Sequence, residues 1–128
     1  YRVISDRRAR AAAGLSMGGG HARRLGLGHP DVFANVGMFS SGECFPLVTE
    51  DMDFRPLFSD KDKFNEYMDV VYVTCGDADP RYDKTCADLK PLQDAGFRVE
   101  FQGYQGQHEW NVWRYSGKDF VKKIFKQK

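Results

Sequence analysis

Two patterns of apolar and polar positions alternate along the chain: short apolar runs, and longer stretches with helical spacing. The clearest run is 69–75 ("DVVYVTC"), a nearly continuous series of β-branched and apolar residues. Such a run is typical of a strand buried on both faces of a parallel sheet. Shorter runs predict strands at 10–15, 35–40 and 97–101, the last with one face more exposed to solvent because it alternates apolar and polar residues.

Stretches with helical spacing lie between and after these runs. They predict helices at 20–28, near 61–67, at 82–95 and at 110–125. Gly28-His29-Pro30 and Gly96 are typical helix terminators. In the last helix, the apolar side chains that fall broadly on one face are Trp113, Phe120, Ile124 and Phe125. The order of elements predicts a mostly parallel α/β sheet with flanking crossover helices, one domain or part of one over residues 1–128.

The charge and cysteine content of the chain limit the kinds of binding partner that it is expected to have. The 128 residues carry a net charge of +1, and acidic and basic residues are interspersed. This argues against a nucleic-acid partner or an anionic membrane surface. No apolar run approaches the roughly 18 residues that a membrane span needs. Cys44, Cys75 and Cys86 lack CxxC spacing, so neither a disulfide framework nor a zinc site is indicated; one bridge and unpaired thiols both stay open.

Residues 13–20, "AGLSMGGG", contain the pattern G-x-S-x-G around Ser16. This pattern is the nucleophile elbow, a sharp strand-to-helix turn that exposes a serine oxygen. We expect Gly14 and Gly18 to avoid a collision across the turn, and the Met17 backbone N–H to stabilise an oxyanion with the help of the helix dipole. The next two glycines, Gly19 and Gly20, would let the first turn of the helix pack closely against neighbouring elements. The pattern alone is weak, and the alternative is a glycine-rich helix start whose serine has no chemical role.

A nucleophilic serine needs a base, and the chain has three histidines. His108 lies in a loop after the last predicted strand, on the sheet edge that should carry Ser16. His21 falls in the first helix, where packing or capping is the plainer role, and His29 falls at its exposed end. We therefore predict His108 as the base.

The acid that orients this base is predicted in the loop after strand 69–75. Asp77 and Asp79 both follow that strand, which gives the chain order Ser, Asp, His of the α/β-hydrolases. Asp79 is preferred because it lies further into the loop, beside Pro80. The alternative is that these aspartates and Asp83 only solvate the loop or cap the helix. Glu109 is expected at the surface or in a supporting position.

Three stretches carry a resemblance to a known family: "AGLSMGGGHARRLGLGHPDVFANVGMFS", "VVYVTCGDADP" and "YQGQHEWNVWRYSGKDFVKKIF". They resemble the carbohydrate esterases that include feruloyl and acetyl-xylan esterases, with esterase D-like relatives. The resemblance implies an α/β-hydrolase fold in which Ser16, Asp79 and His108 form the triad. It also implies feruloyl or acetyl esters of plant polysaccharides as substrates, no metal or organic cofactor, and a secreted or periplasmic location.

Two aromatic residues, Trp110 and Trp113, flank the histidine loop. Trp110 is expected to contact an aromatic acyl group or a sugar, or else to pack in the core, and core packing is favoured for Trp113. Residues 43–67, where the family varies, would form the acyl or sugar pocket or a solvated insertion.

Only 15 residues precede Ser16, so the chain resembles the carboxyl-terminal half of such a domain. A second oxyanion donor is expected to lie outside it, which predicts weak or no activity of this chain alone. Apolar edges would then favour self-association or a preceding segment that completes the sheet. Other α/β-hydrolase chemistry (siderophore esterase, thioesterase or acyltransferase) and a non-catalytic module that binds carbohydrate or protein are the alternatives.

Overall fold

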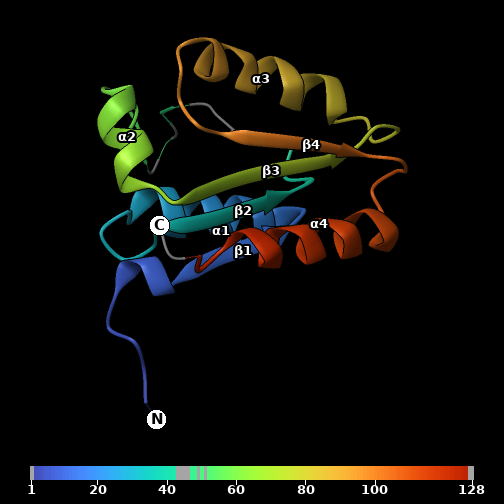
Figure 1. Cartoon of the computed structure of the whole chain (residues 1–128). Helices are drawn as coiled ribbons and strands as arrows, with labels where there is room; N and C mark the ends of the chain where they lie inside the picture. Colours follow the sequence, from blue (N-terminus) through green and yellow to red (C-terminus); the bar gives the residue numbers. More distant parts are fainter. Residues whose placement is uncertain (1, 43–46, 49, 51, 127–128) are drawn as a thin grey trace.

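A computed structural model describes residues 2–42, 47, 48, 50 and 52–126. Its strands form one parallel sheet in chain order: β1 (Ala11–Leu15), β2 (Asn35–Phe39), β3 (Val70–Gly76) and β4 (Glu100–Tyr104) (Figure 1). The helices are η1 (Arg7–Ala9, a 3-10 helix), α1 (Met17–Gly28), α2 (Lys61–Tyr67), α3 (Tyr82–Asp94) and α4 (Trp110–Lys123). The predicted parallel α/β sheet with flanking helices is therefore confirmed.

The sheet has helices on both faces. Side chains alternate between the faces along β3. Val71 and Val73 pack into a core that α1, α2 and α3 complete, whereas Tyr72 packs with Phe120 of α4. Every residue of β3 is buried, which explains the continuous apolar run in its sequence. Because the strands are parallel, their carboxyl ends and the loops that follow them lie at one edge of the sheet (Figure 1).

Several predicted boundaries were wrong. The first helix begins at Met17 rather than at residue 20, directly after the serine. The last strand spans Glu100–Tyr104 rather than 97–101, and Phe97 instead turns into the core against Phe58 and Phe64. Phe125 lies beyond the end of α4 and is 55% exposed, so it does not share the helix's buried face.

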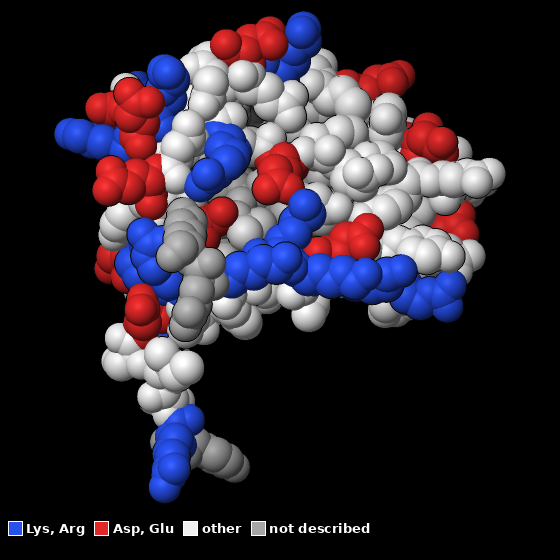
Figure 2. Space-filling view, in the orientation of Figure 1, with Lys and Arg blue, Asp and Glu red and all other residues white. Residues whose placement is uncertain are grey.

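The structure also bears on the predictions made from the cysteines, the charges and the hydropathy of the chain. Cys75 and Cys86 carry thiols rather than a disulfide in the described residues, and Cys44 lies outside them. On the face shown in Figure 2, acidic and basic side chains are intermingled over the upper part, and a row of basic side chains runs across the lower part. In the part of the chain that the structure describes, no helix has the length and hydropathy to cross a bilayer.

Candidate active site

Ser16 occupies a strained turn between β1 and α1. Its φ is +54° and its ψ is −124°, outside the regions that residues with side chains usually adopt. Hydrogen bonds hold this conformation: the Ser16 N–H donates to the Phe39 carbonyl at 2.8 Å, and the Ser16 carbonyl accepts from the Gly19 N–H at 3.0 Å. Strain of this kind is concentrated at functional sites, where the surrounding structure must support it. The turn therefore has the backbone geometry expected of a nucleophile elbow.

The glycines around Ser16 are not equally needed. A Cβ at Gly14 would lie 2.1 Å from the Gly18 carbonyl oxygen, and one at Gly19 would lie 2.6 Å from Cβ of Ser41. A Cβ at Gly18 or Gly20 would meet no described atom within 4 Å apart from its chain neighbours and the nearby backbone of α1 itself. The expectation for Gly14 and Gly19 is supported, whereas the one for Gly18 and Gly20 was wrong. The crowding is one-sided, because the backbone of the first helical turn faces Gly14 while the Cβ position of Gly18 points into open space.

Ser16, His108 and Asp79 form a continuous chain of hydrogen bonds. Ser16 Oγ lies 2.8 Å from His108 Nε2, and His108 Nδ1 lies 2.8 Å from Asp79 Oδ2. A carboxylate can only accept, so His108 Nδ1–H donates to Asp79, and Nε2 is left to accept from the serine hydroxyl. This is the tautomer that a general base needs. The loops after β1, β3 and β4 each supply one of the three side chains.

Asp79 is enclosed by donors. Its side chain is fully buried, and its Oδ1 accepts from the Arg81 backbone N–H at 2.9 Å and from the Arg81 guanidinium at 3.1 Å. Burial alone would raise the pKa of Asp79. The hydrogen bonds from the Arg81 backbone, from His108 and from the Arg81 side chain outweigh burial, and they hold this pKa below its ordinary value. Asp79 is therefore a carboxylate at neutral pH.

The other candidates lie in different positions. Asp77 is exposed, and its Oδ1 accepts from the Gly106 N–H at 3.1 Å, which shapes the histidine loop without contacting the ring. Glu109 accepts from the Gln107 N–H at 2.9 Å in the same loop. His21 and His29 are exposed on α1 and at its end. Met17 is the first residue of α1, so its N–H lies at the positive end of the helix beside Ser16.

Trp113 contacts the candidate base, which sequence reasoning missed. Its ring meets the His108 ring edge to face at 4.9 Å between centroids, and its Nε1–H donates to Ser40 Oγ at 3.1 Å. Ser40 follows β2, is buried and has a φ of +53°. Trp110 packs edge to face on Trp113 at 5.4 Å but is itself 73% exposed. Trp113 therefore packs against the His108 ring, and Trp110 packs on Trp113 toward the solvent. These two indole rings form an aromatic wall beside His108.

An open groove of about 450 Å³ lies beside this wall. Its lining includes Gly14, Leu15, Phe39, Trp110 and Trp113, and is mostly apolar. Within the described residues, no group of three or more histidine, cysteine or acidic side chains could hold a metal ion. Neither Ser16 nor His108 lines this groove, and Trp113 is the residue that contacts both the groove and the His108 ring. The triad itself can activate a serine hydroxyl.

The chain is similar in sequence and fold to known proteins. The chain is 28% identical, over 127 residues, to a protein named endo-1,4-beta-xylanase/feruloyl esterase from Xylanibacter ruminicola; the match covers 98% of this chain and 16% of that protein. Its structure is similar to that of a ferulic acid esterase, with a TM-score of 0.71 and 29% identity over 93% of this chain and 52% of the other. S-formylglutathione hydrolase (FrmB) from Staphylococcus aureus has a similar fold, with a TM-score of 0.69 and 19% identity over 96% of this chain and 54% of that one.

These likenesses confirm the α/β-hydrolase-type fold that the sequence predicted. The chain spans about half the length of the solved structures to which it is similar. A model of the Esterase family, described as "Putative esterase", matches residues 1–119. The chain therefore belongs to the Esterase family.

Proposed function

We propose that this protein is a serine carboxylic-ester hydrolase that uses Ser16, His108 and Asp79 as its catalytic triad. The observation that carries the proposal is the unbroken chain of two 2.8 Å hydrogen bonds from the strained elbow serine through His108 to a buried carboxylate. Nucleophile, base and orienting acid are thus within hydrogen-bond reach of one another. Membership of the Esterase family and the names of the similar proteins support the same reaction class.

In the first step, Ser16 Oγ attacks the ester carbonyl while His108 Nε2 takes the hydroxyl proton. Asp79 stabilises the imidazolium that forms, and it keeps the ring in the required tautomer. The negative charge on the carbonyl oxygen is placed near the Met17 N–H and the amino-terminal end of α1. Collapse of this intermediate breaks the bond to the alcohol oxygen, which leaves with the proton from His108.

In the second step, His108 takes a proton from water, and the resulting hydroxide attacks the acyl group on Ser16. The bond to Ser16 Oγ breaks, the acid leaves, and the proton returns from His108 to the serine. The mechanism as written uses no metal or organic cofactor.

For the substrate, we propose feruloyl or acetyl esters of plant polysaccharides. Two relatives are named as feruloyl or ferulic acid esterases. An aromatic acyl group could stack on Trp110, which is exposed, lines the groove and packs on Trp113, the neighbour of the His108 ring. Siderophore ester, thioester and acyl-transfer chemistry use the same triad, so a screen of feruloyl, acetyl, thioester and siderophore substrates separates these alternatives. A non-catalytic carbohydrate- or protein-binding module would have no use for the hydrogen-bonded triad.

The decisive test is covalent labelling of Ser16 by a fluorophosphonate in a protein that spans the whole family domain, with p-nitrophenyl acetate turnover measured in parallel. We expect Ser16→Ala to abolish labelling, and His108→Ala to lower the rate of acylation by up to about 10⁶. Ser59→Ala and His21→Ala are matched controls, because both residues are exposed and lie outside the triad. Labelling that persists in Ser16→Ala, or that falls equally in His21→Ala, would overturn the assignment.

A further inference from the structure

The Arg81 side chain reaches both the acid and the base of the triad. Its guanidinium Nη1 lies 3.1 Å from Asp79 Oδ1 and 3.4 Å from His108 Nδ1. The loop after β2 lies against its aliphatic stem: a Cβ at Gly42, where φ is +80°, would be 3.1 Å from Cδ of Arg81. Arg81 also begins α3, as its N-cap residue. The cation is therefore held between two loops beside the histidine ring.

The contact between Arg81 and His108 cannot be an ordinary hydrogen bond in the active tautomer. A guanidinium only donates, and His108 Nδ1 already carries the proton that it donates to Asp79 at 2.8 Å. What remains is a positive charge close to the ring nitrogen. That charge opposes a second positive charge on the imidazole, and it also offsets part of the negative charge of Asp79. Both effects favour the neutral ring.

Other charged groups of the two loops contact the backbone instead of the ring. Asp77 accepts from the Gly106 N–H, and Glu109 accepts from the Gln107 N–H. From α4, the ring is faced by Trp113, which has no charge. Of the described charged side chains, Asp79 and Arg81 are those with a hydrogen-bond-range contact to His108. The negative charge of Asp79 and the positive charge of Arg81 therefore together determine the electrostatic potential at the His108 ring.

We propose that Arg81 is a positioning residue that holds Asp79 in place and lowers the proton affinity of His108, which extends the base-competent range to lower pH. Its role in catalysis rests on the proposed function. Its effect on the ring does not, because ring protonation can be measured without any substrate.

The test is an NMR titration of the ¹⁵N-labelled imidazole of His108, assigned by its loss in His108→Gln. We expect Arg81→Gln to move the titration midpoint to higher pH, because the variant removes the positive charge that lies 3.4 Å from His108 Nδ1. Arg81→Lys keeps the charge and should restore most of the shift. Lys90→Gln removes one positive charge from the far part of α3 and should leave the midpoint in place. A midpoint that stays or falls in Arg81→Gln would overturn the proposal.

The unsubstituted chain provides a second measurement, which does not depend on the folding of a variant. Salt screens exposed charges more than buried ones. Raising the salt should therefore weaken the influence of Arg81 more than that of the buried Asp79, and the His108 midpoint should rise. A midpoint that falls as salt is added would contradict the proposal.

The acid limb of kcat/KM for p-nitrophenyl acetate should move in the same direction in Arg81→Gln. If ring titration shifts as expected but Ser16 shows no acylation in a protein that spans the whole family domain, the inference on Arg81 stands and the proposed function fails. If Ser16 is acylated but the ring titration does not move, the inference on Arg81 fails alone.

Discussion

At the scale of single residues, Asp79 and Asp77 provide the sharpest contrast. Both follow β3, but Asp79 Oδ2 contacts His108 whereas Asp77 Oδ1 accepts a backbone N–H. Asp79→Asn puts an amide beside Nδ1, which disfavours the active tautomer, and we expect acylation to slow by about 10⁴. Asn at 77 can still accept from the Gly106 N–H, so Asp77→Asn should change the rate little. Rates of fluorophosphonate labelling measure both, and a larger loss in Asp77→Asn would show that the acid is misassigned.

The one-sided crowding at the elbow makes a second prediction. Gly14→Ala would place a Cβ 2.1 Å from the Gly18 carbonyl oxygen, so the backbone must shift to make room. We expect this shift to lower the free energy of unfolding by about 1–3 kcal/mol or more. Gly18→Ala and Gly20→Ala place Cβ atoms in open space within α1, where alanine is favoured over glycine by up to about 1 kcal/mol. Urea unfolding of the three variants tests this. Equal destabilisation by Gly14→Ala and Gly18→Ala would refute the one-sided picture.

Sequence reasoning identified the residues whose signal is local or ordered along the chain. The pattern around Ser16, and the loops that follow two predicted strands, were enough to nominate Asp79 and His108. Arg81, Ser40 and Trp113 were missed as parts of the site. The Ser40 and Trp113 side chains join positions 73 residues apart, and no local periodicity encodes such a contact. The remaining signal was positional: Ser40 stands at the carboxyl end of a strand, and Arg81 follows Asp79 by two residues.

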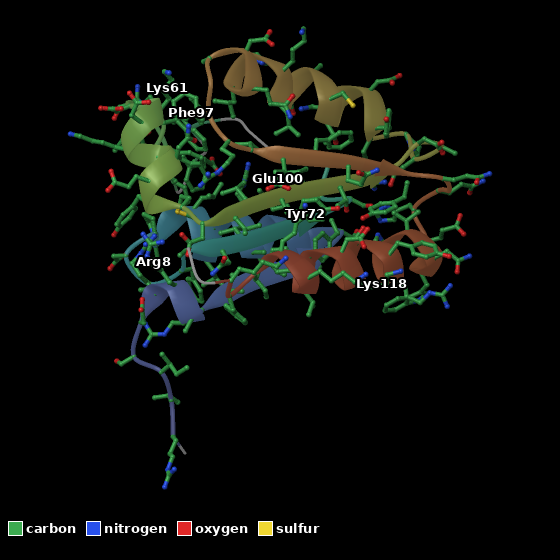
Figure 3. The ribbon with its side chains drawn as sticks, viewed as in Figure 1. Arg8, Lys61, Tyr72, Phe97, Glu100 and Lys118 are labelled. Atoms are coloured by element: carbon green, nitrogen blue, oxygen red, sulfur yellow. The ribbon has the colours of Figure 1, made fainter. Side chains whose placement is uncertain are left out.

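At the scale of elements, a chain of hydroxyl groups joins α4 to the sheet. Tyr72 Oη lies 2.8 Å from Tyr104 Oη, and Tyr104 Oη donates to Asp119 Oδ2 at 2.5 Å. Figure 3 shows Tyr72 and Glu100 on the strands of the sheet, and Glu100 pairs with Lys123 of α4 at 2.8 Å. Burial, followed by the bonds to Asp119 and Tyr72, raises the pKa of Tyr104. This network links β3, β4 and α4, and α4 carries Trp113.

The raised pKa of Tyr104 predicts a loss of stability in alkali. The folded state retains the phenol proton more tightly than the unfolded state, so this stabilisation is complete below the unfolded pKa near 10 and is lost as pH rises above it. Tyr104→Phe should cost about 1–2 kcal/mol at pH 8, and its deficit should shrink between pH 9 and 11. Urea unfolding at each pH measures this, with the exposed Tyr67→Phe as the control. A deficit that grows with pH would contradict the network.

Element boundaries depended on contacts that the sequence does not show. The run 97–101 has the alternation of a strand, but its first residue packs on aromatic rings from the α2 region, and pairing with β3 begins at Glu100. Alternating apolar residues fit a strand that begins at 97 as well as one that begins at Glu100. The pairing with β3 decides between these two starting points. By contrast, β3 was predicted to within one residue at each end, because burial on both faces leaves a continuous apolar run.

At the scale of the whole molecule, β1 and β4 are the two edge strands of the sheet that the structure describes, and the edge strand that leads into Ser16 is β1. It pairs with β2 alone, and Ala13 at its centre is exposed, whereas all of β2 and β3 is buried. The Ser16 N–H points toward β2, since it donates to Phe39. Backbone N–H groups alternate sides along a strand, so those of Ala12 and Gly14 face β2 while those of Ala11 and Ala13 face outward. The outer row can accept another strand.

Hydrogen exchange followed residue by residue tests this picture of the edge. In dilute solution, the amides of Ala11 and Ala13 should exchange much faster than those of Ala12, Gly14 and the residues of β3, because they have no partner within the described sheet. If copies of the chain associate through this edge, protection of Ala11 and Ala13 should rise with protein concentration while β3 stays unchanged. Equal protection of all four β1 amides at every concentration would show that the outer edge is already covered, and association through β1 would then be excluded.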